Sequence, residues 1–142
     1  YPVVYLKADL YDGSYHPVDS SEMAFKIAAS LAYKEGLMKA NPVLLEPVAN
    51  VKVYAPSDMI GDIMSAFTKR RGRVLGMTPT ERKGEQMLEA EAPIAEMSDF
   101  AIQLRAITQG RGTYTMKFER YEDVPQMVAD KIIAEAKANA EE

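Results

Sequence analysis

Apolar and polar residues alternate along residues 3–11, and this pattern predicts a strand with one buried face. The alternation ends at Asp12-Gly13-Ser14, a sequence typical of turns. The next regular pattern begins only after Val18, so residues 15–18 are expected to form a short loop.

A helix is predicted after this loop, because apolar residues recur every four positions from Met23 to Leu31. Asp19 and Glu22 have the spacing of a capping box, in which two side chains bond the free N–H groups of the first turn. Gly36 is the expected end of the helix. Beyond Asn41-Pro42, residues 43–45 are predicted to form a brief strand that ends at Pro47.

A second and more complete pattern begins near residue 48. It predicts strands at 51–56, 73–80, 86–93 and 113–121, and helices at 57–71, 98–108 and 124–138. The first of these helices is expected to bury Ile60, Ile63, Met64 and Phe67 and to stop at Gly72, and the last to dock through Val128, Ile132 and Ile133. Leu88, Ala90 and Ala92 are expected on the buried face of their strand, and Tyr114, Met116 and Phe118 on that of theirs.

The order of these elements defines the fold class, which is α+β. Residues 48–121 follow the order β-α-β-β-α-β, which predicts a ferredoxin-like split βαβ domain with a four-stranded antiparallel sheet. The first segment is an incomplete β-α-β piece, because a unit of this size buries too little surface to be stable alone. We therefore expect three parts, at residues 1–46, 47–121 and 122–142, the last being a C-terminal helix.

The composition excludes several kinds of chemistry. The chain has no cysteine, which excludes disulfides, thiolate zinc sites, iron–sulfur clusters and cysteine nucleophiles. Its single histidine, His16, excludes a two-histidine metal site. No apolar run approaches the roughly 20 residues that span a bilayer, and no signal peptide is evident, so we expect a cytoplasmic protein with no membrane partner.

Two motifs carry a resemblance to a known family. GSYHPVDSSEMAF (residues 13–25) and TQGRGTYTMKF (residues 108–118) resemble segments of bacterial elongation factor G, and similar segments occur in the same order along nearly the whole chain. The resemblance identifies residues 1–46 with the end of domain IV and residues 47–121 with domain V of that family. It implies a C-terminal fragment of a translational GTPase that moves tRNA and mRNA through the ribosome.

The resemblance implies specific partners and no enzymatic activity for this chain. Gly13, Ser14, Tyr15 and His16 would contact tRNA and mRNA in the decoding centre, and the ferredoxin-like domain would contact large-subunit rRNA and a protein at the stalk base. The chain lacks the GxxxxGK[ST] phosphate-binding loop, so no cofactor is expected in it. GTP and Mg²⁺ would bind a domain that precedes this region in the parent protein.

His16 is the most informative single residue of this resemblance. Its place between a predicted strand and a capped helix puts it on a loop, where an imidazole can bond phosphate or stack on a base. The family usually has Asp after this histidine, whereas this chain has Pro17. Proline restricts the backbone, which predicts a stiffer loop or a paralogue with a changed task.

Charge is unevenly distributed along the chain. The net charge of −4 equals that of the last 21 residues, which hold six acidic and two basic side chains, whereas residues 69–83 are strongly basic. The candidate rRNA contacts are Lys69, Arg70, Arg71, Arg73 and Arg111, with Arg105 as a further exposed cation. Cations at a helix end also offset the helix dipole, so a purely structural role for this run stays open.

Three functional hypotheses remain at this point. The first is the ribosome-binding region of an elongation factor G-like protein, which works as a monomer. The second is a paralogue that acts in ribosome recycling or protection, and the third is a ferredoxin-like regulatory module that binds a ligand. An isolated fragment also exposes sheet edges, through which two copies could pair as a dimer.

Overall fold

The computed structural model describes residues 1–141, which divide into two compact units. Unit 1 is residues 1–43 and unit 2 begins at Leu44. The division lies three residues before the boundary expected from the sequence, and the C-terminal helix belongs to unit 2 instead of forming a part of its own. The helices and strands are α1 (Glu22–Lys39), β1 (Leu45–Pro56), η1 (Ser57–Met59), α2 (Ile60–Lys69), β2 (Arg73–Pro79), β3 (Glu85–Pro93), η2 (Ile94–Glu96), α3 (Phe100–Thr108), β4 (Thr113–Asp123) and α4 (Gln126–Ala140).

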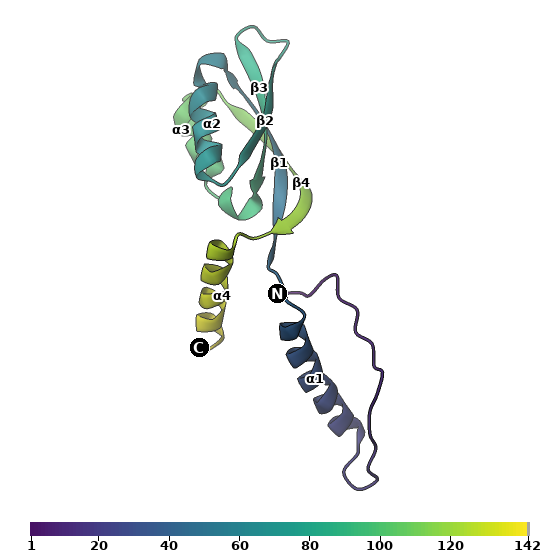
Figure 1. Cartoon of the computed structure of the whole chain (residues 1–142). Coiled ribbons are helices and arrows are strands. Elements are labelled where there is room, and N and C mark those ends of the chain that lie inside the picture. Colours follow the sequence, from purple (N-terminus) through teal and green to yellow (C-terminus); the bar gives the residue numbers. More distant parts are fainter. Residues whose placement is uncertain (142) are drawn as a thin grey trace. The chain divides into compact units, whose positions relative to one another are not determined.

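Unit 2 has the predicted ferredoxin-like fold. Its four strands are antiparallel and lie in the order β2-β3-β1-β4, and α2 and α3 cover one face of the sheet (Figure 1). This strand order is that of a split βαβ domain, in which each helix connects strands that are not neighbours. The predicted α+β class is confirmed.

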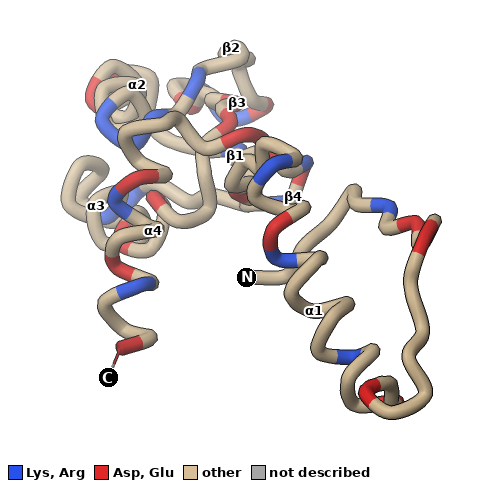
Figure 2. The backbone as a smooth tube through the Cα atoms, turned by 60° about the horizontal axis from the view of Figure 1, so that its bottom comes forward, with Lys and Arg blue, Asp and Glu red and all other residues tan. Residues whose placement is uncertain are grey.

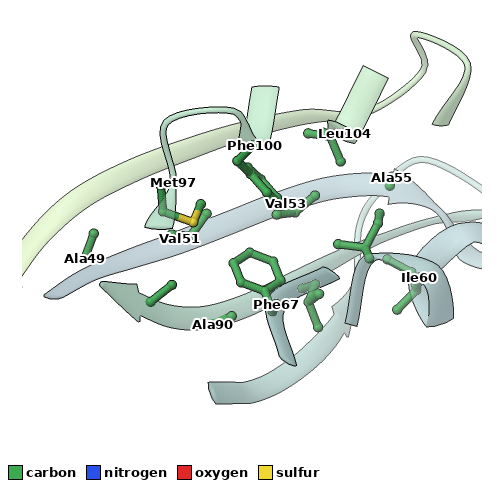
Figure 3. Packing of buried hydrophobic residues seen from close by; sticks show 13 residues of the cluster. Ala49, Val51, Val53, Ala55, Ile60, Phe67, Ala90, Met97, Phe100 and Leu104 are labelled. Atoms are coloured by element: carbon green, nitrogen blue, oxygen red, sulfur yellow. The ribbon is translucent and has the colours of Figure 1, made fainter. Parts of the chain in front are cut away.

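The core of unit 2 lies between the sheet and these two helices (Figure 3). Small side chains on β1 and β3, such as Ala49 and Ala90, let the helices approach closely. Phe67 of α2 and Phe100 of α3 then fill the space, with ring centroids 5.0 Å apart. Tyr114 of β4 packs edge-on against Phe100, also at 5.0 Å. The expectations for Ile60, Ile63 and Leu88 hold as well, since all three are buried.

The prediction of a brief strand ending at Pro47 is wrong, because β1 runs through this proline without a break. Pro47 pairs with Tyr121 of β4, whereas pairing with β3 begins one residue later, at Val48. A proline has no N–H to donate, so it is tolerated where one side of the strand has no neighbour.

The end of α2 also differs from the prediction. The helix ends at Lys69, and the left-handed residue that follows is Arg71 (φ 57°), not Gly72. Position 72 requires glycine for a different reason, because there is no room for a side chain. A Cβ there would lie 2.8 Å from the carbonyl oxygen of Phe67 and 3.2 Å from that of Glu91. The N–H of Gly72 donates to the same Phe67 oxygen, at 2.8 Å, and closes the helix end.

The expectation that Met116 and Phe118 are buried is wrong. Both pair with β1 at Val51 and Ala49, so they lie on the helix-covered face of the sheet. Neither helix extends over them, and they remain 44% and 49% exposed. In α4, Ala129 is buried, Val128 and Ile132 of the predicted docking stripe are half-buried, and Ile133 is exposed.

Unit 1 departs further from the predictions. Residues 3–11 form no strand, and α1 continues through Gly36 to Lys39. Ser21, not Asp19, caps α1, because its hydroxyl accepts a hydrogen bond from the Ala24 N–H at 3.1 Å. A strand needs a neighbour to bond its N–H and C=O groups, and residues 1–43 supply none.

Across residues 1–141, no helix has both the length and the apolar character needed to cross a membrane. The same residues contain no group of three or more metal-ligating side chains.

Candidate nucleic-acid interface

The loop before α1 is built around the carbonyl oxygen of His16. This oxygen accepts hydrogen bonds from the N–H groups of Asp19 (3.2 Å) and Ser20 (2.8 Å), which makes a tight turn with Pro17 at its second position. Proline favours that position because its fixed φ already matches the turn. The N–H of His16 donates to the Ser20 hydroxyl at 2.8 Å. Pro17 therefore helps to shape this loop.

The side chains of this loop point to solvent. The His16 imidazole is exposed and makes no hydrogen bond with any residue that the structure describes. Tyr15 is 65% exposed, and its ring stacks on Phe25 of α1 with a centroid distance of 6.3 Å. Gly13 donates its N–H to the Asp12 carboxylate at 2.8 Å. The four residues predicted to contact tRNA and mRNA, Gly13 to His16, are thus on one exposed loop with a free imidazole.

The basic run at the end of α2 does not form one patch. Arg70 is buried at 8% exposure, donates to the Asp99 carboxylate at 2.7 Å, and lies over the Phe100 ring. Arg71 binds Glu46 through two parallel hydrogen bonds of 2.7 and 2.9 Å. Of the four cations in the run, Lys69 alone is exposed without a carboxylate partner among residues 1–141.

Arg73, the fourth cation, takes part in an ion-pair network on the sheet face that the helices leave open. Its Nη2 donates to Glu91 at 2.5 Å, and Arg120 binds the same carboxylate through two hydrogen bonds of 2.9 Å. Arg120 also pairs with Glu122. Hydrogen bonds from Arg120 and then from Arg73 lower the pKa of Glu91 from its ordinary 4.5 to about 2, so this carboxylate stays ionised at acidic pH where a free glutamate is protonated.

Two further cations remain available. Arg105 and Arg111 are exposed and form no salt bridge within the described part of the chain, and the Arg111 guanidinium donates a hydrogen bond to the Met59 sulfur at 3.8 Å. Met59 precedes α2 and Lys69 ends it, so a helix of ten residues, about 15 Å long, separates Arg111 from Lys69. Figure 2 shows basic and acidic positions interspersed through unit 2 instead of gathered on one element.

The sequence alone did not identify the acidic partners. Glu46, Glu91 and Asp99 lie 18 to 29 residues from the arginines that they bind. The surplus of acidic residues was the available signal, but it does not say which carboxylate meets which arginine.

Unit 2 has a ferredoxin-like fold, and the loop at residues 13–16 of unit 1 is exposed. Residues 43–132 match the family model described as elongation factor G C-terminus, and residues 1–41 match that described as elongation factor G, domain IV. Neither of the matched models is a GTPase domain. The chain belongs to the elongation factor G family, of which it represents a C-terminal region.

A solved structure supports the same assignment. The chain is similar to a protein of Thermus thermophilus, whose crystal structure is titled ttk003000868, with 46% sequence identity and a TM-score of 0.71. The similarity covers 88% of this chain and 19% of that one. The chain thus spans about a fifth of the length of this relative.

Proposed function

We propose that this region binds the ribosome and acts in the movement of tRNA and mRNA during protein synthesis. The observation that carries the proposal is the exposed loop 13–16, with its free His16 imidazole, in a chain that belongs to the elongation factor G family. In this proposal the loop enters the decoding centre beside tRNA and mRNA. GTP and Mg²⁺ belong to a separate domain of the parent protein, and the site of action is the cytoplasm.

The contact of unit 2 with large-subunit rRNA is proposed to run through Arg105 and Arg111, with Lys69 as a separate contact at the other end of α2. These cations are exposed and free of carboxylates among residues 1–141, so they can bond phosphate without breaking a pair. Arg70, Arg71 and Arg73 already bind carboxylates, and an rRNA contact would compete with those bonds. We assign these three mainly to the fold.

Salt dependence tests the rRNA contacts. If Arg105 and Arg111 each neutralise one phosphate, log Kd of the ribosome complex rises with log salt concentration, and each substitution by Gln lowers the slope by about 0.7–0.9. The measurement is a titration of the chain against ribosomes at several salt concentrations. Lys52→Gln is the matched control, because Lys52 is an exposed cation on β1 whose side chain lies on the opposite face of the sheet. An equal change in slope for the control would contradict the assignment.

The role of the loop is tested by His16→Ala in the parent protein. We expect ribosome binding and GTP hydrolysis to stay normal and mRNA movement to slow. Unchanged mRNA movement would remove His16 from the proposal. Val18→Ala is the matched control, since Val18 lies in the same turn and is 94% exposed but offers no polar group.

The region is proposed to act as a monomer. The edge strands β2 and β4 both contain a register shift, at Val74/Gly76 and opposite Val48/Ala49 respectively. Such irregularities interrupt the row of free N–H and C=O groups that a second copy would need for pairing.

A further inference from the structure

The chain enters unit 2 through a segment that is anchored from two sides. The carbonyl oxygen of Leu44, the first residue of unit 2, accepts a hydrogen bond of 2.9 Å from the Val124 N–H. Two residues later, the Glu46 carboxylate receives the two bonds from Arg71. Arg71 Nε also donates to Glu96 of η2, at 3.2 Å. We call Glu46, Arg71 and Glu96 the junction clamp.

The backbone conformation of Arg71 suggests that this position needs a guanidinium group. Its φ of 57° lies in the left-handed region, which a side chain makes unfavourable and which glycine adopts freely. A glycine here would close α2 with less strain, but it would leave Glu46 without its cation. Glu46 is only 8% exposed, and a buried carboxylate without a partner is costly.

The clamp belongs entirely to unit 2, yet it sits where unit 1 is joined to it. Unit 1 ends at Val43, and Asn41 just before has a left-handed φ of 58° followed by Pro42. Hydrogen bonds hold the chain from Leu44 onward, and the N–H of Ala40 still bonds the last turn of α1. The residues with neither kind of support are 41–43.

We propose that Arg71 is a positioning residue: by holding Glu46, it keeps the start of β1 fixed on unit 2 and confines the joint between the units to residues 41–43. This rests on the proposed function, because a short joint limits where the His16 loop can reach once unit 2 is bound to rRNA. The competing interpretation is that the clamp only stabilises unit 2.

Arg71→Gly separates these interpretations. The variant loses the clamp, but it also relieves the strain of the left-handed position, so the two effects on stability oppose each other. Gln109→Gly is the matched control, because Gln109 ends α3 with a φ of 53° and its side chain makes no hydrogen bond with residues 1–141. Both variants remove the same kind of strain, and only one of them removes the clamp.

The first measurement is ¹⁵N relaxation on the whole chain. We expect the order parameters of the Leu44–Glu46 amides to fall from about 0.85 to below about 0.6 in Arg71→Gly and to stay unchanged in Gln109→Gly. Arg71→Lys keeps the charge but not the two parallel hydrogen bonds to Glu46, so we expect intermediate order parameters. Unchanged order parameters in Arg71→Gly, with unit 2 folded, would overturn the proposal.

The second measurement uses the lack of cysteine in this chain. Ala28→Cys on the exposed side of α1 gives a unique attachment point for an iron–EDTA probe, whose radicals cleave nearby rRNA in the ribosome complex. With the clamp intact we expect a narrow set of cleavages. Adding Arg71→Gly should spread them over more nucleotides, and adding Gln109→Gly should not. An equally narrow set in both would overturn the proposal. Failure of every variant to bind ribosomes would instead refute the proposed function, and the relaxation data would still decide the clamp.

Discussion

Unit 1 and unit 2 contain helices with similar apolar spacing but different burial. In α2 the repeating positions Ile60, Ile63 and Phe67 are all buried. In α1, Met23, Ile27 and Leu31 repeat every four residues, yet the helix has no buried residue. Periodicity thus indicates which element forms, whereas burial requires a second layer for the apolar face to cover.

The strands show the same contrast. Residues 86–93 alternate and become β3, which is paired with β1 on one side and β2 on the other. Residues 3–11 alternate equally well and form no strand. An isolated strand leaves all of its backbone N–H and C=O groups to water, so alternation alone gives it no stability. The following substitutions test this difference between the two units.

Phe67→Ala should have the largest effect. The side chain is fully buried between the helices and the sheet, so its removal should cost about 3–5 kcal/mol in the free energy of unfolding of unit 2. The measurement is urea unfolding followed by the amide NMR signals of β1. Phe25→Ala in α1 is the control, because Phe25 is 48% exposed. A shift of the unit 2 midpoint by the control, as large as that from Phe67→Ala, would contradict the separation of the units.

Glu91→Gln should cost about 1.5–3 kcal/mol at pH 7, because Arg73 and Arg120 lose a charged acceptor. The pKa of Glu91 is lower in the folded state, so its contribution is complete above about pH 4.5 and is lost as the pH falls toward 2. The melting temperature of unit 2, measured between pH 7 and pH 2, should show this loss. The variant should show a smaller loss over the same range.

Glu35→Gln in unit 1 is the control for the ion-pair network. The pair that Glu35 forms with Lys39 is 2.8 Å long, but both side chains are at least 70% exposed. Its loss should cost no more than about 0.5 kcal/mol. An equal effect at the two sites would mean that the network of unit 2 contributes no more than a solvated surface pair.

The same substitution should have opposite signs at two glycines. Gly72→Ala should destabilise unit 2 by about 1–3 kcal/mol, because its Cβ would meet the backbone oxygen of Phe67. Gly36→Ala should stabilise α1 by about 0.5–1 kcal/mol, because that position is inside a helix with open space around it. The two effects are read from unfolding of unit 2 and from the helicity of α1. Destabilisation in both would show that Gly36 has a packing partner.

Ser21→Ala should cost less than the substitutions of Phe67 and Glu91 in unit 2, about 1 kcal/mol in the stability of α1, since its hydroxyl accepts a hydrogen bond from the Ala24 N–H. Asp19→Ala should leave α1 unchanged. Cα chemical shifts of residues 22–26 measure the helicity of the first turn. If Asp19→Ala lowered this helicity more than Ser21→Ala does, Asp19 would be the cap, as the predicted capping box requires.

Much of the fold of unit 2 could be predicted, because each of its patterns finds the partner it needs. The order of elements and the buried faces of α2 and β3 are as predicted. One kind of error concerns side chains on the core face that stay exposed, as at Met116 and Phe118. Another concerns which residue adopts a special backbone conformation, since Arg71 and not Gly72 has the left-handed φ. Such errors depend on contacts between distant residues, which local patterns do not contain.

The candidate site was predicted unevenly for the same reason. Exposure of the His16 loop follows from a local signal, a turn before a capped helix. Whether the arginines of the basic run are paired depends on Glu46, Asp99 and Glu91, which lie elsewhere in the sequence. A count of charges indicates a cationic segment, but only the folded chain shows that three of its four cations are already paired.

The sequence by itself determined the kinds of element, their order in unit 2 and the family, because each depends on residue types and their spacing along the chain. Tertiary structure decided which alternating segment becomes a strand, which apolar stripe is covered and which arginine pairs with a carboxylate. Those outcomes depend on what lies opposite each residue in space, and hydrogen bonding and burial are properties of such pairs.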